Sequence, residues 1–253
     1  MILKIKHFVI LITFLCFFSC KKKSFVITSI KGKQIELQDS VQSIDSINDF
    51  VTPYRNRINQ ILDSTLAYAP KTISKEDGKY NTSEGNLMAD IVMSEANPIF
   101  KSRTGNEIDF TLLNFGGIRS IISKGNVSAR TAYQVMPFEN SIIIAELTGK
   151  SVRELVYFLI NSDVPHPISG LQVILDKRNK LQSVNIKGEP FNEDKNYYVA
   201  TSSYLLTGGD KMSFFKDNVG VTEVDYMIRN AMIDYFKKVD TIAPFVDDRF
   251  IKL

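Results

Sequence analysis

Histidine, the side chain most often used for acid–base catalysis and for binding transition metals, occurs only twice in this sequence. The two residues are His7 and His166 among 253, and His7 lies in a segment that we expect to be removed. A Ser-His-Asp triad would have to use His166, which stands between two prolines and is expected to be an exposed loop residue. A histidine-rich metal centre needs several such ligands, and no Walker loop or Gly-x-Gly-x-x-Gly motif occurs. The residues taken alone therefore indicate a protein that binds a ligand rather than a catalyst.

One segment has the composition of a ligand-binding turn. Asn114 is followed by Gly116 and Gly117 and then by Arg119. The glycines would let the backbone bend tightly and approach a ligand closely, and the guanidinium of Arg119 could bind an anion through two parallel hydrogen bonds. By itself the same segment is more typical of a tight turn that carries a surface arginine.

Two other segments have ordinary structural interpretations when each is taken singly. Phe138 follows Pro137, which could present the ring on a loop, but a phenylalanine in such a place more often belongs to the hydrophobic core. Asp210 follows Gly208 and Gly209 and is typical of a turn, for which no ligand is needed.

The elements that would position these segments alternate between helix and strand. Apolar residues at helical spacing predict helices, and β-branched runs predict strands. Pro53 could mark the start of the first helix, because proline is tolerated in a first turn. The mixture predicts one α/β domain, with a mixed sheet and flanking helices. The predicted helices cover 43–67, 86–96, 129–135, 152–161 and 221–237, the strands cover 108–113, 141–147, 171–175, 181–186 and 198–202, and 69–82 is a connection.

The N-terminal residues are typical of a signal peptide. Basic residues precede an apolar run over 8–18, which as a helix would span about 16 Å, roughly half of the bilayer core. Such a run suits a signal-peptide core rather than a membrane-spanning helix. Ser19 directly before Cys20 resembles a bacterial lipobox, so we predict a signal peptide over 1–19 and lipidation of Cys20, with an ordinary signal peptide as the alternative. Either way the protein would act outside the cytoplasm, and the lipid would anchor it to a bacterial membrane at the cell envelope.

Composition and charge describe an ordinary globular protein. Hydrophobic residues make up 44% and charged residues 23%, with 31 basic and 28 acidic side chains. No basic block beyond the signal peptide is larger than Lys21-Lys22-Lys23, so nucleic acid is not expected as a partner. Residues 20–45 are predicted to be a lipid-anchored lead-in with a short hairpin over 25–37, and 46–253 the main domain.

Four segments in a fixed order carry a resemblance to a known family. They are Gly85-Asn86-Leu87-Met88-Ala89-Asp90, Asn114-Phe115-Gly116-Gly117-Ile118-Arg119, Met136-Pro137-Phe138-Glu139-Asn140 with Glu146-Leu147-Thr148-Gly149, and the run from Ala200 to Asp210 that ends in Thr207-Gly208-Gly209-Asp210. Together they resemble the C-terminal domain of the 5′-nucleotidase family, the half that holds the base and sugar of the nucleotide. The resemblance covers about 47–233 and implies the fold of that domain and a nucleoside or nucleotide ligand.

The resemblance also implies roles for individual polar residues. Asn114 would contact the base, Arg119 would reach the ribose and phosphate, and Asp210 would accept hydrogen bonds from the ribose hydroxyls. Gly170 would line the base pocket through its backbone. Many family members carry a further phosphate-binding arginine before the first segment; here Lys79 is the cation that could replace it, without the fork geometry of a guanidinium.

Two aromatic residues match the clamp that holds the purine in this family. Phe138 would form one side and Tyr204 the other, where phenylalanine is commoner. Tyrosine keeps an aromatic face, so stacking is expected to survive, and each stacked base–ring contact contributes about 1–3 kcal/mol in proteins that bind single strands.

Full-length members of this family also carry a metallophosphoesterase domain with two metals, for which we see no room before the resemblance begins. We therefore expect no metal or other cofactor in this chain. Three interpretations stay open. The chain could be the substrate-binding half of a split 5′-nucleotidase in nucleotide catabolism, inactive alone and completed by a separate metallophosphoesterase chain that holds divalent metals. It could instead be a stand-alone nucleoside-binding surface lipoprotein, or a non-catalytic interaction module.

Overall fold

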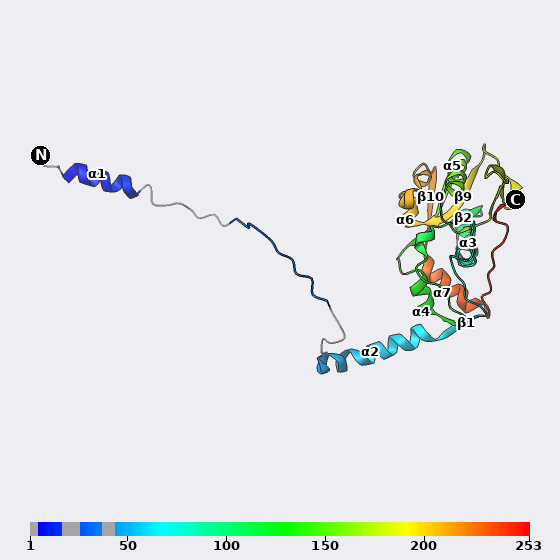
Figure 1. Ribbon diagram of the computed structural model, residues 1–253, viewed down its shortest axis with the longest axis horizontal. Helices are drawn as coiled ribbons and strands as arrows, with labels where there is room; N and C mark the ends of the chain where they lie inside the picture. Colours follow the sequence, from blue (N-terminus) through cyan, green and yellow to red (C-terminus); the bar gives the residue numbers. More distant parts are fainter. Residues whose placement is uncertain (1–4, 17–25, 37–43) are drawn as a thin grey trace. The chain divides into compact units, whose positions relative to one another are not determined.

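The computed structural model describes residues 5–16, 26–36 and 44–253, and the chain divides into two compact units, Met1–Phe50 and Val51–Leu253 (Figure 1). In the first unit, α1 (Ile5–Cys16) lies within the predicted signal peptide. No helix within the described ranges is both long and apolar enough to span a membrane. Cys20, the predicted lipidation site, falls outside the described residues.

The hairpin predicted over 25–37 is wrong over its described part. Residues 26–36 form no strand, and their side chains are exposed. Two short strands on their own bury too little apolar surface to be stable in water. The β-branched residues on either side of Gly32 therefore do not lead to strand pairing.

The first long helix confirms the prediction from apolar spacing, but with different ends. α2 (Asp45–Asp63) begins at Asp45, whose carboxylate suits the positive end of the helix dipole. Pro53 consequently lies inside the helix rather than at its start. The helix ends at Asp63, because the residues that follow form the unpredicted strand β1 (Thr65–Ala69).

A mixed five-stranded sheet runs through the second unit and confirms the predicted α/β class. Its strands in spatial order are β10 (Gly220–Met227), β4 (Ser141–Thr148), β9 (Asn196–Ser202), β2 (Phe110–Leu112) and β5 (Ile168–Ser169). β2 and β9 run parallel, and the other neighbours run antiparallel. α3 (Ser83–Thr104) and α7 (Ile228–Lys238) cover one face, whereas α5 (Gly149–Ile160) covers the other (Figure 1). The hydrophobic core therefore forms two layers, one on each side of the sheet.

Two smaller sheets and several short helices complete the described part of the second unit. One sheet has the order β11 (Phe250–Lys252), β6 (Leu171–Leu175), β7 (Leu181–Ile186) and β8 (Glu189–Pro190), and the other pairs β1 with β3 (Gly125–Ser128). The short helices are α4 (Ala129–Val135), α6 (Ser203–Leu206) and the 3₁₀ turns η1 (Phe115–Gly117), η2 (Gly209–Lys211) and η3 (Ser213–Phe215). The predicted bounds of α4, β6 and β7 are confirmed.

The helix predicted over 221–237 is wrong in its first half. The residues up to Met227 form β10 at the edge of the five-stranded sheet, and only the residues after it form α7. The β-branched side chains at the start of β10 favour an extended backbone. The register of pairing shifts between Glu223 and Met227, where Asp225 has a φ of 53°, so the strand bulges just before the helix begins.

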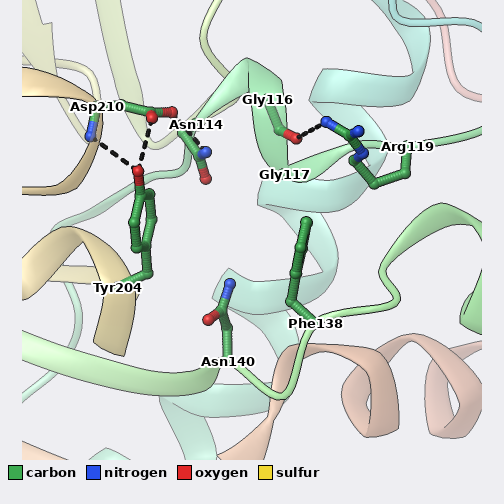
Figure 2. A pocket seen from close by; sticks show the side chains of 8 residues that line it. All are labelled: Asn114, Gly116, Gly117, Arg119, Phe138, Asn140, Tyr204 and Asp210. Carbon is green, nitrogen blue, oxygen red and sulfur yellow. Dashed lines mark hydrogen bonds between the residues drawn. The ribbon is translucent and has the colours of Figure 1, made fainter. Parts of the chain in front are cut away.

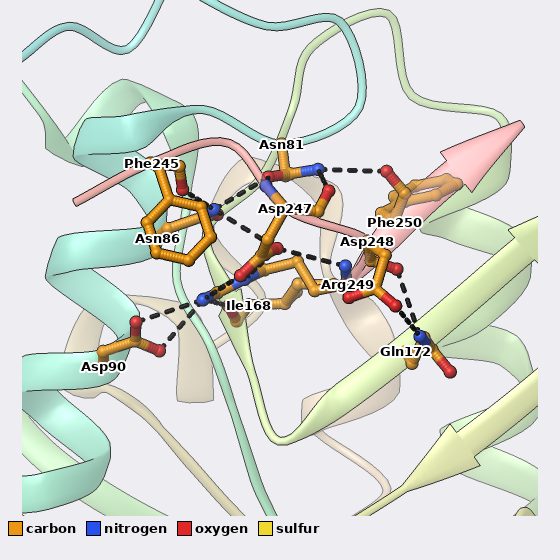
Figure 3. Close-up of polar contacts among 10 residues, drawn as sticks. All are labelled: Asn81, Asn86, Asp90, Ile168, Gln172, Phe245, Asp247, Asp248, Arg249 and Phe250. Carbon is orange, nitrogen blue, oxygen red and sulfur yellow. Dashed lines mark hydrogen bonds and ion pairs between the residues drawn. The ribbon is translucent and has the colours of Figure 1, made fainter. Parts of the chain in front are cut away.

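Two buried asparagines tie the C-terminal tail to the start of α3 (Figure 3). Asn81 donates through Nδ2 to the carbonyls of Asp247 at 2.9 Å and Phe250 at 3.0 Å. Asn86 donates to Oδ1 of Asn81 at 2.7 Å and to the carbonyl of Phe245 at 2.9 Å. A buried amide without partners would destabilise the fold, so these bonds explain why polar side chains occupy the interior here.

Arg249 extends this network to the edge of the five-stranded sheet (Figure 3). Its guanidinium donates to the carboxylates of Asp90 and Asp247, and at 2.7 Å to the carbonyl of Ile168 in β5. The two carboxylates compensate the charge of a guanidinium that is mostly removed from water. The start of α3, the tail and β5 thereby form one framework beside β2.

Candidate functional site

A cavity of about 340 Å³ opens where the chain leaves the carboxyl ends of β2 and β9 (Figure 2). This volume is in the range of small-molecule sites. Seven of the eight ligand contacts predicted from the sequence line it, and Asn140 is a further lining residue that the sequence analysis did not select. The lining residues are Asn114, Gly116, Gly117, Arg119, Phe138, Asn140, Tyr204 and Asp210.

One chain of hydrogen bonds joins two sides of the cavity. Asn114, just after β2, donates through Nδ2 to Oδ2 of Asp210 at 2.6 Å. Tyr204, in α6, donates through its hydroxyl to Oδ1 of Asp210 at 2.9 Å, and the amide of Asp210 donates back to that hydroxyl at 3.3 Å. The carboxylate is thus fixed between an amide and a phenol. Each of its oxygens has a second lone pair, which could accept a hydrogen bond from a ligand hydroxyl.

Two glycines are required by this close packing. A Cβ atom at Gly209 would lie 2.5 Å from the ring of Tyr204, and one at Gly117 would lie 2.9 Å from Oδ1 of Asn114. A side chain at either position would displace a member of the hydrogen-bonded chain. These glycines therefore serve the packing of the cavity as well as the tight turns.

Two aromatic rings lie on opposite sides of the cavity (Figure 2). Phe138 stands in the loop between α4 and β4, and Tyr204 stands in α6; these residues are 43% and 44% exposed. The guanidinium carbon of Arg119 lies 5.9 Å from the centroid of the Phe138 ring. Rings with uncovered faces on both sides of one cavity can stack on a planar ligand between them.

Arg119 and Asn140 supply the remaining polar side chains of the cavity. Within the described residues, the hydrogen bond of the Arg119 side chain is a long one, 3.4 Å to the carbonyl of Gly116, which leaves most of its donors for an anion. The amide of Asn140 points between the two rings and makes no hydrogen bond to another described residue (Figure 2). Asn140 belongs to the Met136–Asn140 segment of the family resemblance, which was the available signal for it.

Residues 64–217 match the sequence model of the family described as 5′-nucleotidase, C-terminal domain. The chain belongs to this family. A trifunctional nucleotide phosphoesterase, YfkN of Bacillus subtilis, is 26% identical over 214 residues, which cover 78% of this chain and 14% of the relative. The cell wall protein Lmo0130 of Listeria monocytogenes is 28% identical over 189 residues, which cover 68% of this chain and 24% of the relative.

Solved structures agree with the fold of the nucleotidase C-terminal domain. The 5′-nucleotidase precursor from Thermus thermophilus superposes with a TM-score of 0.68 at 20% identity, covering 83% of this chain and 43% of that one. The chain spans less than half the length of each of these three relatives. At this identity the likeness shows a shared fold, and the roles of the cavity residues stay predictions.

A buried histidine supports the cavity of this nucleotidase domain from behind. His166 was expected to be exposed in its loop, and this expectation is wrong, because the residue is only 8% exposed. Its Nδ1 accepts a hydrogen bond from the amide of Phe115 at 3.2 Å, and its ring lies 5.3 Å from that of Phe158. Burial lowers the pKa of His166 to about 4, although the nearby Asp210 carboxylate acts in the opposite direction. The imidazole is therefore neutral at pH 7 and holds the start of η1.

Two residues predicted from the family resemblance lie away from the cavity. Gly170 is not among its lining residues; it has a φ of 76°, and a Cβ atom there would come within 2.7 Å of the carbonyl of Asp109. The Nζ of Lys79 lies 5.4 Å from the ring of Tyr80 instead of facing the cavity. A second cation near η1, besides Arg119, is Lys75, which donates to the carbonyl of Ile118 at 2.7 Å.

The described part of the chain contains no group of three or more histidine, cysteine, aspartate or glutamate side chains that could hold a metal ion. The cavity offers two ring faces, one carboxylate, two amides and one guanidinium. This set matches a ligand with a flat apolar part, hydroxyl groups and an anionic group.

Protonation of His166 is expected to destabilise the domain in acid. The pKa is about 4 in the folded state and 6.5 ordinarily, so between these values the unfolded chain binds a proton that the folded chain does not. The contribution of His166 to the free energy of unfolding should therefore decrease as the pH falls through this window, by about 3 kcal/mol in total. Urea unfolding at several pH values between about 4 and 7, with the full chain compared with a variant at position 166, would measure this loss.

The variant His166→Gln isolates this effect, since glutamine retains a hydrogen-bond acceptor but does not titrate. Burial raises the pKa of Glu84 to about 8, which gives a pH dependence of opposite sign. That contribution is present in both proteins and cancels in their difference. Equal pH dependence in the two proteins would contradict the role assigned to His166.

Proposed function

We propose that the cavity binds a nucleoside or nucleotide, with the base stacked between Tyr204 and Phe138. The observation that carries the proposal is the pair of half-exposed rings on opposite sides of one cavity, with the Asp210 carboxylate at its edge. A base is planar and stacks on any aromatic face, and ribose supplies hydroxyls for Asp210. The amide of Asn140 would face the edge of the base, where it can both donate and accept.

The guanidinium of Arg119 would bind the 5′-phosphate. It borders the same cavity as the rings and has donors to spare. A guanidinium can bind two phosphate oxygens through parallel hydrogen bonds. The second cation of this region, Lys75, contacts the ring of Phe115 and the carbonyl of Ile118 instead, so Arg119 would be the main phosphate contact.

For catalysis we propose that this chain is the substrate-binding half of a split 5′-nucleotidase that acts in nucleotide catabolism. A separate metallophosphoesterase chain would hold the divalent metals and activate the attacking water, and this chain would be inactive alone. The similarity to a protein named as a nucleotide phosphoesterase supports the reaction class. A stand-alone nucleoside-binding protein is the second candidate, because the two rings, the carboxylate and the guanidinium of the cavity would also suit a protein that only binds its ligand.

We further propose that the chain is a lipoprotein, anchored through Cys20 outside the cytoplasm at the bacterial cell envelope. The Ser19-Cys20 pair after an apolar run supports lipidation. The relative from Listeria monocytogenes is named as a cell wall protein, which supports a location at the envelope. A lipid anchor would keep the domain at a membrane surface without a spanning helix.

Removing the Phe138 ring tests the base-binding role. Phe138→Ala is expected to weaken adenosine binding by about 1–3 kcal/mol, because one stacking face is lost. Calorimetric titration of the purified full chain with adenosine would measure this change. As a matched control, Tyr157→Ala removes an exposed ring on α5 that does not line the cavity and should leave the affinity unchanged. Absence of adenosine binding by the wild-type chain would refute the proposal.

Removing the Arg119 guanidinium separates phosphate binding from base binding. Arg119→Ala is expected to weaken the binding of AMP by about 2 kcal/mol more than the binding of adenosine, since only AMP carries the anion that forms charge-assisted hydrogen bonds. The same titration with the two ligands gives the comparison. Arg103→Ala, which removes an arginine bound to the carbonyl of Glu223 and the carboxylate of Asp225, is the control. Equal losses for AMP and adenosine would show that Arg119 does not bind phosphate.

Purification from native membranes tests the split enzyme. The tagged full chain, isolated in mild detergent, is expected to bring down a metallophosphoesterase chain. The pair should hydrolyse AMP, and the activity should disappear with a chelator and return with divalent metal, because the metals activate the attacking water. If adenosine binds but no such partner is recovered and no hydrolysis is seen, the stand-alone binding protein is the better description.

A further inference from the structure

Arg229 is a cation buried at the unfavourable end of a helix. It is the second residue of α7 and is only 6% exposed. The N-terminus of a helix carries a partial positive charge, so a buried cation there is disfavoured by the helix dipole as well as by the loss of water. The nearest carboxylate, Glu139, is 3.9 Å away, and its side chain is 78% exposed, so the ion pair contributes little. Charge pairing therefore does not explain why Arg229 is buried.

The contacts of Arg229 lie on the backbone of one loop instead. Its NH1 group donates to the carbonyl of Pro137 at 3.0 Å and, more distantly, to that of Phe138 at 3.5 Å. The amide of the neighbouring Ile228 donates to the carbonyl of Asn140 at 3.0 Å. The first turn of α7 thus supplies donors to three carbonyls of the segment between α4 and β4. That segment carries both the Phe138 ring and the Asn140 amide into the cavity (Figure 2).

Packing alone does not fix the direction of the Phe138 ring. The residue is 43% exposed, and the guanidinium carbon of Arg119 lies 5.9 Å from the ring centroid, at the outer limit of a cation–π contact. A ring in such surroundings points where its backbone directs it. Pro137 contributes no amide hydrogen that could form a further backbone bond. The carbonyl contacts from α7 are therefore the main constraint on this backbone.

We propose that Arg229 is the positioning residue for Phe138, which keeps the 137–140 loop in the conformation that turns the Phe138 ring and the Asn140 amide toward the cavity. The effect on a ligand rests on the proposed function, whereas the effect on the loop does not. An arginine suits this role because its rigid fork of donors can reach neighbouring carbonyls at once. The guanidinium carbon also lies 4.3 Å from the centroid of the Tyr133 ring in α4, and this cation–π contact helps to hold the side chain in place.

Hydrogen exchange of the full chain tests the loop without any ligand. In Arg229→Met the amides of the 136–141 segment are expected to exchange about tenfold faster or more, because the carbonyl contacts are lost and the loop opens locally. The 114–119 segment on the other side of the cavity should keep its exchange rate. Arg229→Lys retains the charge and one strong donor, so it should give a smaller increase in the exchange rate. It also serves as the test variant if the methionine variant does not fold. Arg103→Met, which also removes an arginine–carbonyl bond, should leave the 136–141 segment unchanged.

Ligand titration then tests what the loop does for the cavity. Arg229→Lys is expected to weaken the binding of adenosine by about fivefold or more, which is the lower end of the effect of losing one stacked ring. The affinity for ribose 5-phosphate, which has no base, should change by less than about twofold, the margin within which independent effects add. In a Phe138→Ala background the same Arg229→Lys change should also alter adenosine affinity by less than about twofold. A general loss of packing would lack this dependence on the base and on Phe138.

Each result bears directly on the proposal. Unchanged exchange of the 136–141 segment in both Arg229 variants would overturn it. It would also be overturned if adenosine and ribose 5-phosphate weakened equally, or if the full loss persisted without Phe138. If the wild-type chain binds no adenosine while the segment exchanges faster in the variants, the proposed function fails but the positioning of the loop by Arg229 stands.

Discussion

The cavity depends on one hydrogen bond between residues that are 96 positions apart, from Nδ2 of Asn114 to Oδ2 of Asp210 at 2.6 Å. Asn114 follows β2 and Tyr204 follows β9, and because these strands are parallel neighbours their carboxyl ends meet at one edge of the sheet. The sheet therefore brings the two turns together, and the carboxylate of Asp210 joins them. Without that contact, each turn would be a separate surface loop.

The aromatic residues that line the cavity and the buried residues that support its loops obey opposite physical constraints. Phe138 and Tyr204 are partly exposed, which leaves ring faces uncovered for a ligand. His166 and Arg229 are buried, and each satisfies backbone groups of one cavity loop: an amide in the first case and carbonyls in the second. Preorganised loops reduce the conformational entropy that a ligand would have to remove on binding. Buried ionisable groups that are poor choices for stability thus have a reason to be where they are.

Much of the fold could be predicted from the periodicity of apolar residues, and the errors of that prediction have a common cause. α4, β6 and β7 were predicted with their observed ends, because their apolar spacing is local and unambiguous. β1 and β3 were missed because they form a two-stranded pair, whose partners are distant in sequence. The first half of 221–237 was assigned to a helix because its apolar residues also fit a helical spacing. These residues form a strand because they pair with the edge of β4. The local sequence contains no sign of that partner.

The difference between local patterns and contacts distant in sequence also separates the cavity residues, which were predicted, from the residues that support them, which were not. Asn114, Phe138 and Asp210 stand in short segments whose order along the chain carries the family resemblance, so the amino-acid sequence alone is enough to name them. The roles of His166 and Arg229 arise from contacts with residues 51 and 92 positions away. A histidine between prolines or an arginine near a helix start gives no sign of the carbonyl or amide that it will meet. The residues that line the cavity can thus be predicted from a sequence, whereas the residues that hold their loops in place require the fold.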